Sequence, residues 1–175
     1  MSYQYLAQPG HIGSMTVKNR MAVSAMGTNL AEEDGSCGQR LIDFHERQAR
    51  GGVGLIIMGV AGVAWPDGGN MPRQVAISDD RFIDGLSAMA EAVHAHDAKV
   101  VTQLHHGGLV AAQDTRDGRP VWVPSYPVNK QGNFLDGLLH EEMAAMFNAD
   151  APPMQLHVVT QEDIKLIVGK FVDRV

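Results

Sequence analysis

The sequence predicts an α/β fold built on a parallel β-sheet, and two patterns carry this prediction. Short apolar runs alternate along the chain with segments that show helical spacing. The run LIIM at 55–58 is apolar without a break, which is typical of a parallel strand buried on both faces. The order strand, helix, strand, helix, strand is the repeated βαβ unit, whose crossover connections are right-handed.

Composition favours a single globular domain. The 175 residues are 45% hydrophobic and 19% charged, with a formal net charge of -6 and no cluster of lysine or arginine, which argues against nucleic-acid binding. The longest uncharged apolar run, 51–65, is shorter than the roughly 20 residues that a membrane span needs. The single cysteine, Cys37, excludes an internal disulfide, and the N-terminus lacks a signal-peptide layout, so we expect a cytoplasmic protein.

The first half of the chain is expected to hold a hairpin, two strands and a helix. Residues 12–19 alternate apolar and polar, as in a short edge hairpin, and MAVSA at 21–25 is the first buried strand. A helix is predicted over 39–50, ended by the glycines that follow it. One face of this helix carries Leu41, Phe44, His45 and Gln48. The second strand is expected over 53–58, followed by a long loop over 59–71.

The second half is expected to hold two helices around a third strand. A helix over 81–96 has an amphipathic stripe with steps of 4, 3 and 4, formed by Phe82, Leu86, Met89 and Val93. The third strand is expected over 99–104, and the long connection after it contains possible helical turns at 141–147. Thr160 is a good N-cap for a last helix. The apolar stripe of that helix is Ile164, Ile167, Val168 and Phe171.

The stretch KVVTQLHHGG at 99–108 indicates a binding site at a strand end. In α/β sheets and barrels, ligands bind at the carboxyl ends of strands. Side chains alternate along a strand, so Val101, Gln103 and His105 share one face. The amide of Gln103 has both a donor and an acceptor and could read the edge of an amide-like ring. The alternative interpretation is that Gln103 only caps loop backbone.

Three common kinds of site are not supported by the pattern. Gly52-Val53-Gly54 resembles the start of GxGxxG, but it precedes its strand and lacks the third glycine. His94 and His96 lie before the third strand and His105 and His106 after it, so one metal cannot bind both pairs. No Ser/His/Asp or Cys/His triad signature is present, and Cys37 is interpreted as a bystander in a turn.

A fourth kind of site, for a flat ring such as a flavin, stays open on pattern alone. Such a ring needs an apolar bed and hydrogen-bonding groups along its polar edge. Loop backbone at Met26-Gly27, small residues around Val60 and the amide of Gln103 come from three successive strand ends. In a barrel these ends converge on one mouth. The alternative is that all of them are ordinary loop residues.

Several motifs follow one another in order along the chain. They are Asn19-Arg20-Met21, SAMGT at 24–28, FHERQARGG at 44–52, the strand at 54–59, VTQLHHG at 101–107, VPS at 123–125 and TQEDI at 160–164. Together they resemble the Old Yellow Enzyme family of FMN-dependent oxidoreductases, closest to its 2,4-dienoyl-CoA reductase and enoate reductase branch. The resemblance runs from about residue 12 to 175, apart from 128–158.

The resemblance implies a (β/α)8 barrel with FMN at its top, and it assigns roles by position. Backbone groups of Ser24, Ala25, Met26 and Gly27 would border the flavin near N5 and O4. Val60 would lie beside the ring, and Gln103 would hydrogen-bond its pyrimidine edge. His106 would order a loop, while His105 could reach the mouth. Catalytic residues are not assigned, no metal is expected, and NADH or NADPH would be the reductant.

Three departures from the family pattern stand out. Gly27 replaces the Cys, Thr or His with which relatives often tune the flavin, and Leu109 replaces a common basic residue. The insert at about 128–158 is longer than in many members. A complete barrel needs roughly 250 residues, so we expect 1–175 to be one partial barrel domain: an N-terminal hairpin and three βα units, with the insert after the third strand.

Three hypotheses follow for the function. The first is the N-terminal part of an FMN-dependent enzyme that reduces an activated alkene, a small-molecule substrate; the chain alone would be inactive and bind FMN weakly or not at all. The second is a non-catalytic half-barrel that associates with itself or with a complementary chain, since open strand edges and apolar faces favour association. The third is a metal-dependent barrel hydrolase that uses His105.

Overall fold

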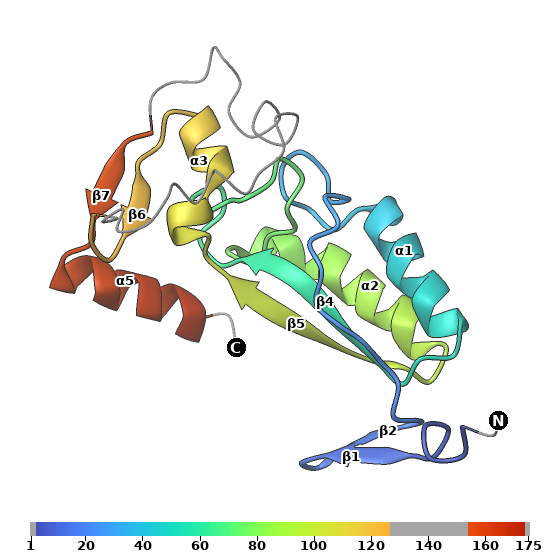
Figure 1. The fold of residues 1–175 in the computed structure, drawn as a ribbon. Coiled ribbons are helices and arrows are strands. Elements are labelled where there is room, and N and C mark those ends of the chain that lie inside the picture. The colour runs from blue at the N-terminus through green and yellow to red at the C-terminus, as the bar shows by residue number, and fades with distance from the viewer. Residues whose placement is uncertain (1–2, 127–153, 174–175) are drawn as a thin grey trace, which may run out of the picture.

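A central parallel sheet organises the computed structural model, which describes residues 3–126 and 154–173 (Figure 1). The strands β3 (Ala22–Val23), β4 (Leu55–Gly62) and β5 (Lys99–His105) pair in the order β3-β4-β5, and both pairs are parallel. The predicted parallel sheet is therefore confirmed.

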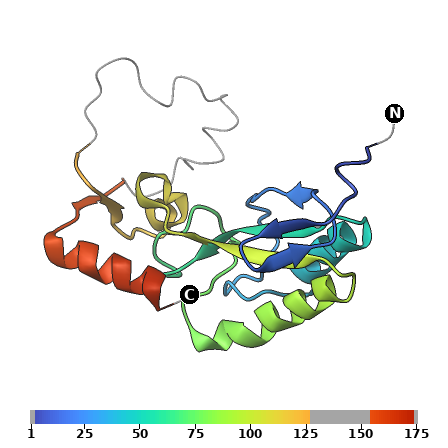
Figure 2. The same cartoon turned by 90° about the horizontal axis from the view of Figure 1, so that it is seen from below.

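Two helices connect the three strands and cover one face of the sheet (Figures 1 and 2). Helix α1 (Gln39–Arg50) has the predicted bounds. Helix α2 (Ile83–His94) follows a 3-10 turn over Asp80–Phe82 and ends two residues earlier than predicted. The chain then turns through Asp97, whose φ of 55° is left-handed, before it enters β5.

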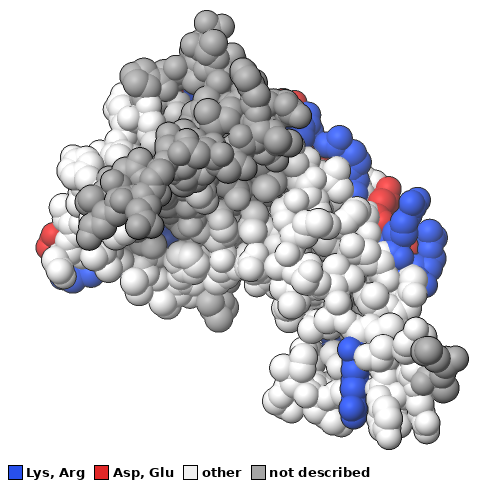
Figure 3. Space-filling view, in the orientation of Figure 1, with Lys and Arg blue, Asp and Glu red and all other residues white. Residues whose placement is uncertain are grey.

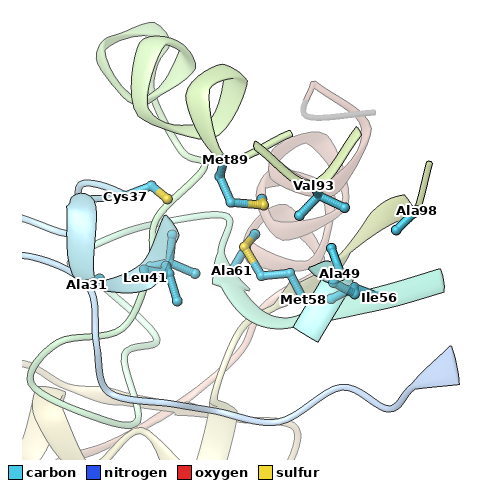
Figure 4. Close-up of a cluster of buried hydrophobic side chains, with 11 residues drawn as sticks. Ala31, Cys37, Leu41, Ala49, Ile56, Met58, Ala61, Met89, Val93 and Ala98 are labelled. Atoms are coloured by element: carbon cyan, nitrogen blue, oxygen red, sulfur yellow. The ribbon is translucent and has the colours of Figure 1, made fainter. Parts of the chain in front are cut away.

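The core lies between this sheet and the two helices, where their apolar faces meet (Figure 4). Met89 and Val93 of α2 and Leu41 of α1 pack over Ile56 and Met58 of β4, and all five are buried. This arrangement accounts for the stripe predicted on α2. It also identifies the sheet face that carries Ile56 and Met58 as the one turned to the helices.

Two strand boundaries differ from the prediction because the chain crosses closely at Gly59. A Cβ on Gly59 would lie 2.8 Å from Met26 N and 3.1 Å from Ala25 Cβ, so only glycine lets the two segments approach this closely. The β4–β5 register shifts between Met58 and Ala61, and β4 continues to Gly62. The loop predicted to begin at residue 59 therefore begins later, and the first strand is shorter than the predicted 21–25.

An antiparallel hairpin of β1 (Gly10–Ile12) and β2 (Met15–Val17) precedes the sheet, two residues earlier than predicted. It ends before Asn19, which is buried and joins the hairpin to the start of β4. Asn19 Nδ2 donates to Gly52 O at 2.7 Å, and Asn19 Oδ1 accepts from Met21 N at 3.1 Å.

A second layer follows β5. A 3-10 turn (Gly108–Val110) leads into the short helix α3 (Ala112–Arg116), and β6 (Val121–Val123) pairs in parallel with β7 (Leu156–Val158). The last three residues of the expected insert therefore form a paired strand. The rest of that segment, including the helical turns predicted at 141–147, lies outside the described residues.

Helix α5 (Gln161–Val172) begins with the predicted N-cap. Thr160 and Asp163 form a reciprocal capping box. None of its residues is buried, and Ile164 and Val168 of the predicted stripe are 46% and 55% exposed.

Among the described residues, no helix combines the length and the apolar character needed to cross a bilayer.

We expect Asn19→Ala to destabilise the fold by about 1–3 kcal/mol, because it leaves the partly buried Gly52 carbonyl and Met21 N–H without their partner. Ser14→Ala in the exposed hairpin turn is the control and should stay within about 0.5 kcal/mol. Urea unfolding followed by circular dichroism measures both. Equal stabilities for the two variants would contradict the role given to Asn19.

Candidate functional site

The carboxyl ends of β3, β4 and β5 lie at the same edge of the sheet because the strands are parallel. The segment after β3 contacts the end of β4: a Cβ on Gly27 would lie 3.7 Å from Val60 Cγ2. Gln103 stands near the end of β5, after Thr102, which pairs with Met58. The structure thus brings the three predicted strand ends to one rim.

The predicted residues at this rim are exposed or half-buried. Met26 is 55% exposed, and Ser24 and Gly27 are also exposed. Ala25 and Val60 are half-buried. These residues are open to a ligand at the rim.

Gln103 lies on the sheet face turned away from the helices. Val100, three residues earlier on β5, packs against the helix-side core, so Val101 and Gln103 point to the opposite, exposed face. Within the described part of the chain, the Gln103 amide makes no hydrogen bond, so its donor and acceptor are available.

The groups at this rim are of the kinds that could hold a flat ring with a polar edge. Within the described residues, no backbone N–H from Met26 or Gly27 is donated to another group, so both are available to an acceptor such as a ring carbonyl. The Gln103 amide offers a donor and an acceptor from the third strand. Backbone donors on one side, Val60 beside them and an amide opposite match the needs of an isoalloxazine. Ser24 to Gly27, Val60 and Gln103 are the residues that would hold it.

The segment at 74–77, for which no element was predicted, runs beside the end of β4. Gly62 N donates to Val75 O at 2.9 Å, and Ile77 N donates to Gly62 O at 3.0 Å, so this segment runs alongside the end of β4. Gln74 is buried, and its Nε2 lies 3.4 Å from His105 Nδ1. No periodic pattern marks this segment, and only the short apolar run VAI at 75–77, directly after Gln74, could have signalled it.

His105 and His106 support neighbouring loops. His106 Nδ1 accepts from Gly108 N at 3.3 Å, and its ring packs against Gly68, whose φ of 71° is left-handed. Burial lowers the pKa of both histidines. Both rings are therefore neutral near pH 7, and the contacts of His106 agree with its predicted loop-ordering role.

The sequence did not predict an ion pair between the buried Asp114 and the partly exposed Arg119. Asp114 on α3 is 1% exposed, accepts from Gly68 N at 2.8 Å and pairs with Arg119 at 2.9 Å. Arg119 Nη2 also donates to Pro66 O at 3.2 Å. The pair therefore ties the loop after β4 to the segment after β5. Burial raises the pKa of Asp114, against the hydrogen bonds from Gly68 and Arg119.

Two other candidates show no sign of a chemical role. Burial raises the pKa of the Cys37 thiol to about 11, so the thiol stays protonated in the core. His96 precedes β5 and His105 ends it, as expected for opposite ends of a strand. Among residues 3–126 and 154–173, no three His, Cys, Asp or Glu side chains are grouped to hold a metal ion, so nothing there supports a hydrolase that uses His105.

Charged groups in the view of Figure 3 lie mainly at the margin of the described surface, where Lys and Arg side chains gather over α1. Helix α1 carries Arg40, Arg47 and Arg50. Most of the other described surface in this view carries no charge.

Parallel strands joined by helices, with their carboxyl ends at one rim, define an α/β fold. The Old Yellow Enzyme from Pichia sp. AKU4542 has the same fold, with a TM-score of 0.76 at 20% identity over 97% of this chain and 41% of that one. Residues 5–174 match the NADH:flavin oxidoreductase / NADH oxidase family. The chain belongs to this family, and the resemblance noted in its motifs is confirmed.

Two curated relatives cover the same region. The NADH oxidase of Thermoanaerobacter brockii is 42% identical over 120 residues, which are 69% of this chain and 18% of the relative. The cinnamate reductase of Clostridium sporogenes is 37% identical over 113 residues, 60% of this chain and 16% of the relative. The chain thus spans less than a fifth of either protein. Family membership implies FMN as cofactor and NADH or NADPH as reductant.

We expect Asp114→Ala to cost on the order of 3 kcal/mol, because it leaves Arg119 and the Gly68 N–H without their buried acceptor. Asp117→Ala is the matched control, since Asp117 contacts the same guanidinium at the surface and should cost less than about 1 kcal/mol. Chemical denaturation compares the two variants. Similar losses would show that the pair does not fix these loops.

We also expect the free energy of unfolding to fall as the pH drops from about 7 to about 5. Burial lowers the pKa of His45, His105 and His106 from 6.5, so the unfolded chain binds protons that the folded chain does not. Backbone hydrogen bonds lower the pKa of Asp34 and Asp163 from 3.8, so the titration of these carboxyl groups changes the free energy of unfolding only below this pH range.

Thermal melts across this pH range measure the effect. His45→Leu is the informative variant, because it removes one buried histidine on α1 and should make the pH dependence shallower. A melting temperature that is constant or rises toward pH 5 would contradict the account.

Proposed function

We propose that this chain is the flavin-facing N-terminal part of an FMN-dependent oxidoreductase that reduces activated alkenes with NADH or NADPH. One observation carries the proposal: the backbone after β3, Val60 and the free amide of Gln103 share one rim. The name of the cinnamate reductase relative supports an alkene as substrate. FMN, when bound, would pass a hydride between the nicotinamide and the substrate.

The chain's own residues would bind and orient the ring. The N–H groups of Met26 and Gly27 would donate to the ring edge that gains negative charge on reduction, and Val60 would exclude water from its face. Gln103 would fix the ring's rotation through its pyrimidine edge. We also propose that 1–175 form a single partial barrel domain with an insert at about 128–158, and that the single cysteine fits a cytoplasmic location.

A non-catalytic half-barrel that associates with itself or with a complementary chain is the second candidate. Exposed apolar side chains favour it, with Val101 at 38%, Leu166 at 53% and Val168 at 55%. Size-exclusion chromatography with light scattering tests it, since a monomer that melts cooperatively would count against association.

Titration of the 175-residue chain with FMN, followed by flavin fluorescence, tests the first candidate. Because the backbone N–H groups after β3 and the Gln103 amide are available at the rim, we expect weak saturable binding and not an absence of binding, with a Kd on the order of 1 mM, and no turnover of NADPH with cinnamate. Riboflavin should bind as well as FMN, because the described rim supplies contacts to the ring alone.

Gln103→Leu should weaken binding by about five- to a hundredfold, because it removes the hydrogen bonds to the ring edge. Gln161→Leu, on the exposed first turn of α5, is the control and should bind as the unmodified chain does. Absence of saturable binding, or equal binding by both variants, would contradict the proposed site. Micromolar binding with turnover would contradict the expectation that the chain alone is inactive.

A further inference from the structure

Met71 lies in the place that a side chain at position 27 would fill. A Cβ built on Gly27 would overlap the Met71 methyl group and would lie 3.4 Å from the Met71 sulfur. The same point lies 3.7 Å from Val60 Cγ2. The thioether therefore stands between the segment after β3 and the end of β4, at the rim described above.

Hydrogen bonds on one side of Met71 hold it to the loop after β3. Arg73 N donates to Asn29 Oδ1 at 2.8 Å, and Ala31 N donates to Arg73 O at 3.2 Å. The Arg73 guanidinium also pairs with Glu33 at 2.6 Å. Asn29 itself has a left-handed φ of 54°, a conformation that asparagine tolerates better than most residues.

Contacts on the other side hold the same segment to β5. Asn70 N donates to Gln74 Oε1 at 2.9 Å, and the buried Gln74 side chain reaches His105. Met71 is thus fixed between two anchors, one from the loop after β3 and one from the end of β5. Its position beside Gly27 follows from the backbone of its segment.

We propose that Met71 is a cofactor-contacting residue whose thioether replaces the missing side chain of Gly27 beside the FMN ring. The proposal rests on the function proposed above, because Gly27 and Val60 are expected to border the flavin. A thioether is polarisable and packs favourably against aromatic rings, but it has no proton to donate. At this place the ring would then receive hydrogen bonds from backbone N–H groups alone.

Protection of methionines from oxidation tests the contact without any turnover. Hydrogen peroxide, applied in the dark, converts exposed methionines to sulfoxides that mass spectrometry assigns to each residue. At an FMN concentration that saturates the fluorescence titration, we expect Met71 and Met26 to oxidise several-fold more slowly. Met21, 41% exposed at the opposite end of the sheet, is the control and should oxidise at an unchanged rate.

One outcome separates this inference from the function on which it rests. Protection of Met26 without Met71 would overturn the inference and leave the proposed rim intact. Saturable binding that protects neither residue would place FMN elsewhere and overturn both. Absence of saturable binding would also overturn both.

A pair of variants tests whether the Met71 side chain fills the space that Gly27 leaves. Met71→Ala should weaken FMN binding by about two- to tenfold, as should Gly27→Ala, since its methyl displaces the thioether. Once Met71 is shortened, Gly27→Ala should cause no further loss. Met154→Ala, 39% exposed beside β7, is the control for loss of a surface methionine.

Circular dichroism melts establish that each variant is folded, and the oxidation experiment needs no variant. Equal losses from Gly27→Ala with and without Met71 would overturn the proposal. Unchanged affinity in Met71→Ala would overturn it as well.

Discussion

Parallel pairing of β4 with strands on both sides is the constraint on which the candidate site depends. Because Val23 pairs with Ile56 and Ile56 with Val100, the three strands run in one direction and end at one edge. Loops that leave this edge must start within a few ångströms of one another. Helices α1 and α2 cover one face of the sheet. The other face, which carries Gln103, is therefore open at the rim.

Glycine sets how closely these loops can approach. Gly59 lets the segment at Ala25 and Met26 cross the end of β4, and Gly27 leaves room for Met71. At Gly59 the backbone of Met26 occupies the space of a side chain, and at Gly27 the side chain of Met71 occupies it. A site built in this way depends on how its loops are anchored, which explains the buried polar contacts of Gln74 and Asp114 beneath it.

The sequence predicted the elements well where periodicity was strong. Helix α1 has the predicted bounds, and the apolar stripe predicted over 81–96 contributes Phe82, Met89 and Val93 to buried positions. The resemblance to a known family supplied the candidate site residues, since spacing alone favoured the interpretation of these residues as ordinary loop residues. The structure places all of them at one rim.

Other features could not be predicted because they depend on contacts between distant segments. The continuation of β4 to Gly62 requires a register shift and a close crossing that no local pattern encodes. The Asp114–Arg119 pair and the anchors of Met71 join residues of separate loops. Met71 was therefore not among the predicted site residues, although the absence of a side chain at Gly27 was visible in the sequence.

The central claim is that three strand ends present one surface to a flat ring. Amide chemical shifts of the nitrogen-15-labelled chain, recorded during addition of FMN, test this claim most directly. The account predicts that the signals of Met26, Gly27 and Val60 and the side-chain amide of Gln103 shift together along one binding curve. Shifts confined to one strand end, or centred on Asn19 and Lys99 at the opposite edge, would contradict it.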